Sequence, residues 1–461
     1  ADLWSVRGGI VPRKGLLEVS EAIFAGGGGE IRVSASTRPG TRGQSSRADV
    51  KISAMPLATL KALWPRVVAP GARDWIGERV SAADFKGGTA QFLTGDYLGD
   101  DASGSNAAGG RLSASFTFEN ATFTPLPGMA PVEVPRALAT LANNDLDVTA
   151  PDAAVVLPGD RRVPLKSGRL LATDVLADRP QAEIAFTTNA QLGPFLETIE
   201  QLPIPAVKQA APLPRAGDGK VSADVKIKLP LVAKVQAQDI VFEGQAKITD
   251  GRFGKIAGRF DVQGFTLLLD LTSTGIDAKG DLLVNGVPAK IAGQHVFAAG
   301  SDLQPPITVT AKLDDADRNQ LGLDINDLVQ GVMPVEISLQ KTSEPDFAIK
   351  VRADLTDVGL TFDAVSWRKE PGKRAAVEAD VVSGKNGGTE LRNFKITGDN
   401  IALEGSVGIA ADNRIREFHF PAFSLNVVSR LELDGVLAAD NIWRIKARGP
   451  TFDGRDAFRS L

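Results

Sequence analysis

The sequence predicts a mainly β fold, an elongated, twisted antiparallel β-sheet with a few short α-helices. Many segments alternate apolar and polar residues, which is the pattern of strands with one buried and one wetted face. Clusters of Gly, Asn and Asp separate these segments every ~8 to 15 residues, as in a meandering all-β chain. Patterns with the helical period of 3.6 are few. Together these observations place nearly all of the chain in one class of structure.

The clearest strand is VSADVKIKL at 221–229. Its Val, Ala, Ile and Leu residues share one face, and its Ser, Asp and Lys residues share the other. Further alternating segments are at 307–313, 348–355, 401–409 and 430–437. Turn signals are at 249–254, 273–281, 284–288 and 384–388. Antiparallel strands joined by short turns follow from this spacing.

Three helices are expected, near 56–80, 190–202 and 314–331. Each follows directly on an alternating segment, and these segments end about 125 to 135 residues apart. A unit of several strands closed by a covering helix therefore recurs along the chain. A proline-rich segment at 203–219 predicts an extended crossing. We expect an N-terminal part of the sheet at 1–205, with the first two helices, and a C-terminal part at 206–461, with the third.

Composition argues against several classes of function. The chain has 461 residues, no cysteine, two histidines and a net charge of −4. Thiolate chemistry is absent, a histidine-rich metal site is disfavoured, and no basic footprint for nucleic acid is visible. No phosphate-binding loop, dinucleotide fingerprint or nucleophile elbow is present either. We therefore predict no enzyme activity, no catalytic residue, no cofactor and no metal.

The remaining polar candidates have structural interpretations. His295 and His419 lie in strand-like segments without a second histidine at ligand spacing. Asp314, Asp315 and Asp317 lack the ligand pattern of a calcium loop, and we expect them to cap a helix. No segment reaches the ~18 to 20 apolar residues of a membrane span. We interpret the chain, which opens on Ala1, as a piece of something larger.

The aromatic balance is unusual, with 21 Phe against one Tyr. Phe suits fully apolar surfaces, although a compositional bias of the source gives the same count. An open sheet of about two dozen strands does not stay flat, and it must close, stack or curl. Stacked faces make a filled sandwich and a scaffold, whereas a U-shaped sheet makes a hydrophobic groove. Such a groove gains ~0.8 kcal/mol per buried CH₂ of an acyl chain. The alternation fits both.

Four blocks of sequence resemble a known family, the large AsmA-like proteins related to YhdP. They are LWPRVVAPGARDWIGERV at 63–80, FENATFTPLPGMAPV at 118–132, GDGKVSADVKIKLPL at 217–231 and GPTFDGRDAFRSL at 449–461. The resemblance implies a groove of the β-taco type, a periplasmic body and an inner-membrane anchor in Gram-negative bacteria. It also implies transport of phospholipid between the inner and outer membranes. The chain departs from the family in lacking the membrane helix and in being short.

Two functions remain open at this point. The first is binding of phospholipid acyl chains in a hydrophobic groove and their conduction between the two membranes. The alternative is a non-catalytic scaffold or assembly factor for outer-membrane proteins or envelope integrity, as proposed for TamB-like relatives. Free sheet edges that recruit strands would favour the alternative.

Under the first function the working residues are apolar side chains of the alternating strands, and each of them is equally consistent with plain core. The predicted groove residues are Val221, Val225, Ile227, Leu229, Phe242, Ile248, Phe260, Val262, Leu267, Leu269, Ile307, Val309, Val335, Ile337, Ile349, Val351, Leu403 and Val407.

Overall fold

The computed structural model describes residues 5–13, 15–41, 43–63, 70–98, 110–175, 177, 179–201, 218–232, 235–256, 260–297, 304–323, 325–341, 347–362, 367–384, 387–425, 429–438, 440 and 442–451. Most of the proline-rich segment at 203–219 and most of the terminal block at 449–461 lie outside these residues. The predicted mainly β fold is confirmed. One large open antiparallel sheet holds 25 strands, counting the two-residue β5 (Met55–Pro56).

The chain divides into two compact units, which we describe separately. Unit 1 contains 1–215, 219–247 and 270–273, and unit 2 contains 216–218, 248–269 and 274–461. The predicted boundary at 205/206 stays a prediction. Within the described residues, no helix has the length and apolar character needed to cross a membrane.

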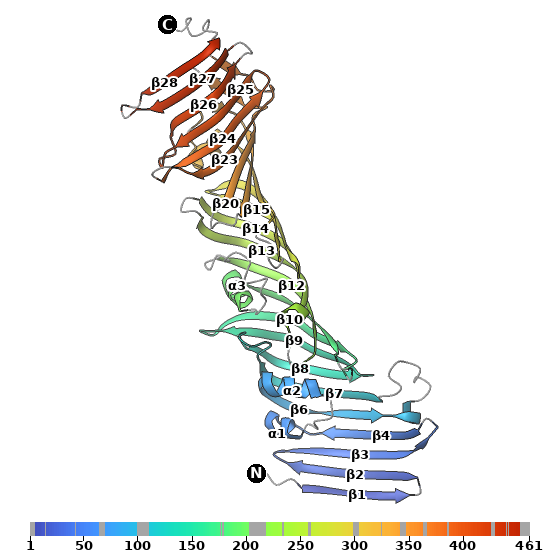
Figure 1. The fold of residues 1–461 in the computed structure, drawn as a ribbon. Helices are drawn as coiled ribbons and strands as arrows, with labels where there is room; N and C mark the ends of the chain where they lie inside the picture. Colours follow the sequence, from blue (N-terminus) through green and yellow to red (C-terminus); the bar gives the residue numbers. More distant parts are fainter. Residues whose placement is uncertain are drawn as a thin grey trace. The chain divides into compact units, whose positions relative to one another are not determined.

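Unit 1 is a meander in which each strand pairs with the next one along the chain, apart from β5, beside which β4 pairs with β6 (Figure 1). Its strands are β1 (Ser5–Arg13), β2 (Leu16–Gly26), β3 (Gly29–Gly40), β4 (Gly43–Ile52), β6 (Val80–Leu93), β7 (Arg111–Phe123), β8 (Val132–Ala142), β9 (Asp145–Leu157), β10 (Arg161–Thr173), β11 (Gln181–Gln191) and β12 (Asp218–Pro230).

Unit 2 continues the same meandering order. The strands β13 (Val241–Ile256) and β14 (Phe260–Thr272) have residues in both units. The others are β15 (Gly275–Val284), β16 (Val287–Val296), β17 (Ile307–Leu313), β19 (Met333–Lys341), β20 (Phe347–Asp354), β23 (Ala375–Ser383), β24 (Thr389–Gly398), β25 (Ile401–Ile409), β26 (Ile415–Leu425), β27 (Ser429–Leu437) and β28 (Trp443–Thr451). A separate small sheet contains β18 (Val329–Gln330), β21 (Gly359–Phe362) and β22 (Trp367–Lys369).

A two-residue turn sets the register of the hairpin between β15 and β16. Asn285 and Gly286, at φ values of 48° and 86°, join β15 to β16, as the turn signal at 284–288 predicts. The turn expected at 249–254 is wrong, because that segment lies inside β13. Its Asp250 has a φ of 53°, so the turn-forming residues bend a continuous strand instead of ending it.

The helices are α1 (Leu57–Leu63), α2 (Pro70–Arg79), α3 (Leu192–Glu200) and α5 (Asp315–Gln320). The first two expected helical regions are confirmed, whereas a helix over the whole of 314–331 is wrong. α5 ends after six residues, and Gly322 has a φ of 77°, which an α-helix does not continue through. The predicted capping is confirmed, since the Asp314 side chain accepts the Asp317 N–H at 2.8 Å.

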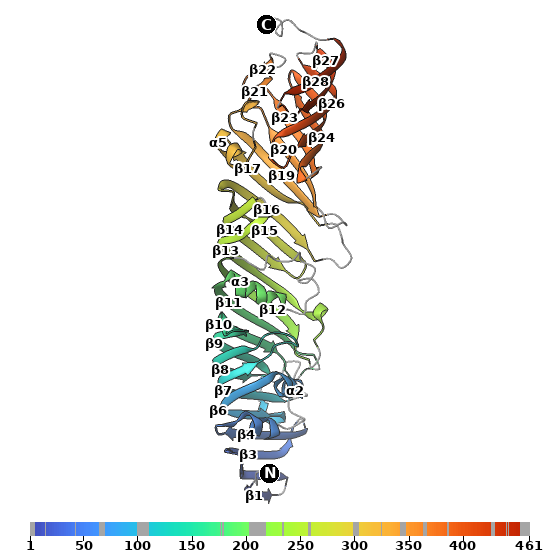
Figure 2. The same ribbon diagram turned by 90° about the vertical axis from the view of Figure 1, so that its left-hand side faces the viewer.

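The helices of unit 1 cover part of one face of the sheet. α1 packs on β6, and Leu60 joins Met55 and Phe85 in a buried cluster. α3 lies over β9, β10 and β11 (Figures 1 and 2) and brings Phe195 against a buried cluster. That cluster contains Val132, Val134, Val155, Leu157 and Val163. The predicted repeat of strand followed by covering helix is therefore present at both places.

In unit 2 the cover includes the small sheet. Val358, Leu360 and Trp367 join one core with residues of the large sheet, including Leu403 and Phe423. α5 contacts the end of β17 (Figure 2). This core also contains a buried cation, Lys369, whose ammonium donates to the carbonyl oxygens of Thr356 at 3.1 Å, Val358 at 2.8 Å and Glu370 at 3.3 Å.

Lys369→Met should destabilise the small sheet by about 1 to 3 kcal/mol, because three carbonyl groups lose their donor.

Burial lowers the pKa of Lys369 below its ordinary 10.5, although Asp357 and other nearby acids act to raise it. The unfolded chain then binds the proton more tightly, so stability in the wild type rises with pH from the lowered pKa up to 10.5. Hydrogen exchange of 355–369 at several pH values measures both effects, and the same pH slope in Lys369→Met would contradict the assignment.

Candidate functional site

In unit 1 the strand registers join apolar side chains into a continuous row, one residue per strand. Each member lies directly opposite the next across the sheet. The first apolar row is Val6, Phe24, Ile31, Ile52, Gly88, Phe116, Ala139, Val148, Leu170, Ile184 and Ile227. At a strand spacing of ~4.8 Å the row is about 50 Å long. Gly88 leaves no gap in it, because the Phe116 ring occupies the space where a Cβ would stand.

Unit 2 contains a second row of the same kind. The second apolar row is Ile307, Leu339, Ile349, Val381, Leu391, Val407, Phe418, Gly435 and Ile445. The Phe418 ring fills the space above Gly435 in the same way, and it lies 5.4 Å from the ring of Trp443 on β28. Apolar surface thus extends to the last described strand.

Burial divides this face into a covered and an open part. On β12, Val221 is 1% exposed, while Val225, Ile227 and Leu229 are only partly buried. The strands of unit 2 show the same contrast: residues near the small sheet are buried, and residues of the second apolar row are mostly partly buried. The open part therefore offers contact area that the described chain does not fill.

The predicted groove residues fall into three groups. Five are buried, namely Val221, Ile248, Val262, Leu403 and Val407. Twelve are partly buried, namely Val225, Ile227, Leu229, Phe242, Leu267, Leu269, Ile307, Val309, Val335, Ile337, Ile349 and Val351. The side chain of Phe260 lies outside the described residues. Four of the eighteen, Ile227, Ile307, Ile349 and Val407, belong to the two apolar rows.

All of the predicted groove residues lie at or after residue 221, although nearly all of the first apolar row lies before it. Its strands alternate, but residues with positive φ shift the alternation by one. Asn120 in β7 and Ser167 in β10 have φ values of 49° and 53°. The sequence signal that could have predicted this shift is an Asn, Asp or Ser inside an alternating segment, because such a residue marks a bulge after which the side chains change face.

The opposite face carries charges that pair across neighbouring strands or along one strand. Ion pairs join Arg169 to Asp147 at 2.7 Å and Lys395 to Glu404 at 2.6 Å. The hydrogen bond from Arg169 holds the pKa of Asp147 below its ordinary value. These exposed pairs add little stability, but their charged groups keep this face of the sheet hydrated. The sheet is therefore apolar on one face and polar on the other.

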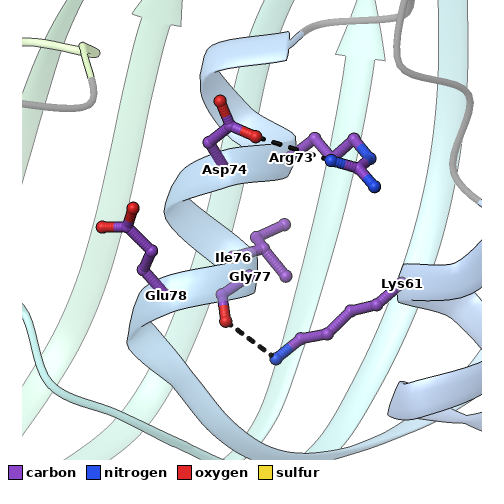
Figure 3. Close-up of a pocket in the computed structure, with 6 residues that line it drawn as sticks. All are labelled: Lys61, Arg73, Asp74, Ile76, Gly77 and Glu78. Atoms are coloured by element: carbon purple, nitrogen blue, oxygen red, sulfur yellow. Dashed lines mark hydrogen bonds and ion pairs between the residues drawn. The ribbon is translucent and has the colours of Figure 1, made fainter.

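Two cavities lie away from the apolar rows. The first, of 190 Å³, lies between α1 and α2 and is lined by Lys61, Arg73 and Glu78 among others (Figure 3). Lys61 donates to the carbonyl oxygens of Gly77 at 3.4 Å and Val80 at 2.7 Å, so it caps the end of α2. The second, of 380 Å³, is lined by 128–131, 156–158 and Gln201 near the end of α3.

Comparison with known proteins adds no relative. The chain matches no protein-family model, no curated protein and no solved structure. The resemblance to AsmA-like proteins accordingly stays a prediction from the four sequence blocks.

Proposed function

We propose that this chain binds the acyl chains of phospholipid along its apolar rows and conducts them without covalent chemistry. The observation that carries the proposal is the continuity of the rows, because every strand of the two series contributes an apolar or glycine residue in register. A filled core needs apolar patches that match another layer. A sliding chain needs an uninterrupted path, and a single polar residue in the row would break it.

Bulges support a curled sheet, as the groove requires. Asn120, Ser167, Asp250 and Asn393 all have φ between 49° and 53°, and each lies inside a strand. A bulge bends its strand and increases the local twist. Bends repeated in strand after strand would fold the sheet along its length into a U-shaped groove, with the apolar rows inside and the ion pairs outside.

The resemblance to AsmA-like proteins supplies the setting of the proposal. In that setting the chain is a periplasmic segment of an inner-membrane-anchored protein. Its ligands are phospholipids, which would pass between the inner and outer membranes. Headgroups would stay in water, while each CH₂ that moves from one row position to the next exchanges equivalent contacts worth ~0.8 kcal/mol.

Lipid binding is tested with the purified chain. Native mass spectrometry should find adducts of phospholipid mass. A photoreactive benzoylphenylalanine at Ile227, on the first apolar row, should crosslink to lipid, whereas the same residue at the neighbouring Lys226 or Lys228 on the polar face should not. Equal crosslinking from both faces, or no adduct in a folded sample, would reject the proposal.

The free edges favour a second candidate, a scaffold that recruits strands of other envelope proteins. Among the described residues β1 and β28 each pair with one neighbour, and Ile10 and Ile445 are exposed there. Against it, β28 carries Arg444, Lys446 and Pro450, which are typical of edges that resist pairing. Crosslinks from β1 or β28 to a barrel protein, without lipid adducts, would favour this candidate.

A further inference from the structure

A cluster of possible metal ligands lies on the polar face of unit 2. His419 on β26 is directly opposite Asp434 on β27, and Glu432 lies two residues before Asp434 on the same face. One ligand atom from each of the three lies within 4.8 Å of the others. The His419 Nδ1 is 2.6 Å from the Asp434 Oδ1.

Packing on the other face fixes the backbone under this cluster. The residues that flank it point to the apolar face, where the Phe418 and Phe420 rings lie 5.2 Å apart and Leu433 packs with the core. Successive side chains of a strand point to opposite faces, so anchoring these residues holds His419 and Asp434 on the polar side. The exposed ligand side chains then need only rotamer changes to converge.

The oppositely charged neighbours on β27 and β28 do not form ion pairs with each other at this place. The register sets Glu432 opposite Arg448 and Asp434 opposite Lys446. Within the described part of unit 2, neither carboxylate forms an ion pair with its basic neighbour, and Asp434 pairs with His419 instead. The Asp434 carboxylate thus pairs with the imidazole and not with the edge strand.

We propose that His419, Glu432 and Asp434 form a solvent-facing site for a divalent transition-metal ion, with Zn²⁺ as the expected occupant. One imidazole nitrogen and two carboxylate oxygens suit Zn²⁺ better than Mg²⁺ or Ca²⁺, which prefer oxygen ligands alone. Ligand atoms about 2.0 to 2.2 Å from Zn²⁺ lie about 3.3 Å apart. The His419 Nδ1 and the Asp434 Oδ1 would therefore move apart from 2.6 Å while the Glu432 carboxylate adjusts its position, and exposed side chains make such shifts easily. Water completes the coordination.

The chain itself provides the control, because His295 is its only other histidine. Titration calorimetry with ZnCl₂ should give one ion per chain, and His419→Gln should weaken binding by about tenfold or more. Glu432→Gln should do the same while it leaves the pair of His419 with Asp434 intact. His295→Gln should change nothing.

Removal of Arg448, as Arg448→Gln, should strengthen Zn²⁺ binding several-fold, because a positive charge near the ion is lost. The proposal is overturned if Glu432→Gln binds Zn²⁺ as tightly as the wild type, which would mean that the three residues do not act as one site. It is also overturned if His295→Gln weakens binding as much as His419→Gln. Circular dichroism of every variant should match the wild type, so that loss of binding reports the site.

Discussion

Arg318→Met should destabilise the segment that follows β17 by about 3 to 5 kcal/mol, more than any surface substitution. The guanidinium is 0% exposed, although it carries a full charge. It donates to the carbonyl oxygens of Leu313 at 3.0 Å, Gly331 at 2.8 Å and Val329 at 2.9 Å, to the Asn326 Oδ1 at 2.8 Å, and to Asp315. A methionine fills much of the volume but leaves these acceptors unpaired in a buried place.

Hydrogen exchange of 313–331 is the measurement, because a chain of two units need not unfold in a single step. Protection there should fall by about 100-fold or more. Arg352→Met is the matched control: its guanidinium is 62% exposed and pairs with Glu378 on the surface, so we expect a change within about 0.5 kcal/mol. Equal effects of the two substitutions would contradict the role assigned to Arg318.

Arg318 also explains why the helix predicted over 314–331 ends after Gln320. The apolar spacing of Leu321, Ile325, Leu328 and Val329 fits a helix, yet these residues lie in turns, irregular backbone and β18. The guanidinium binds carbonyl groups from both ends of the segment, and it folds the chain back after one and a half turns of helix. A side chain that bonds to backbone groups 5 to 13 residues away leaves no periodic signal.

The strands were predictable where the alternation was unbroken. The segments 401–409 and 307–313 coincide with β25 and β17, because one buried face dictates a period of two. The turn predicted at 249–254 is wrong because of a bulge, since Asp250 suits a turn and a bent strand equally well. Only pairing with neighbouring strands decides between the two.

The alignment of residues within the apolar rows could not be predicted from the sequence either. Alternation identified Ile227 and Ile349 as facing the apolar side, but it could not align them with Ile184 or Val381. Register across a sheet depends on turn length and bulges, which a single strand does not contain. For the same reason the sequence does not show that the His419 Nδ1 lies 2.6 Å from the Asp434 Oδ1, since the two residues are 15 positions apart in the chain.

A second large effect is expected from charges placed on the apolar face. Ile337 and Val351 are directly opposite each other on β19 and β20, next to the second apolar row. In the double variant Ile337→Asp, Val351→Asp, an acyl chain that crosses these strands would have to desolvate two carboxylates and lose the contacts of several CH₂ groups. At ~0.8 kcal/mol per CH₂, loss of two of them already weakens binding about tenfold. We therefore expect at least a tenfold fall in lipid adducts by native mass spectrometry.

The control uses the opposite face of the same part of the sheet. Thr308 and Ser338 also form a register pair, and Thr308→Asp with Ser338→Asp adds the same two charges there. If lipid moves along the apolar face, only the first double variant loses its adducts, while hydrogen exchange shows both to be folded. If the apolar face were instead a plain core, the first variant would lose its fold before its lipid. Equal retention of lipid by both folded variants would place the ligand elsewhere on the molecule.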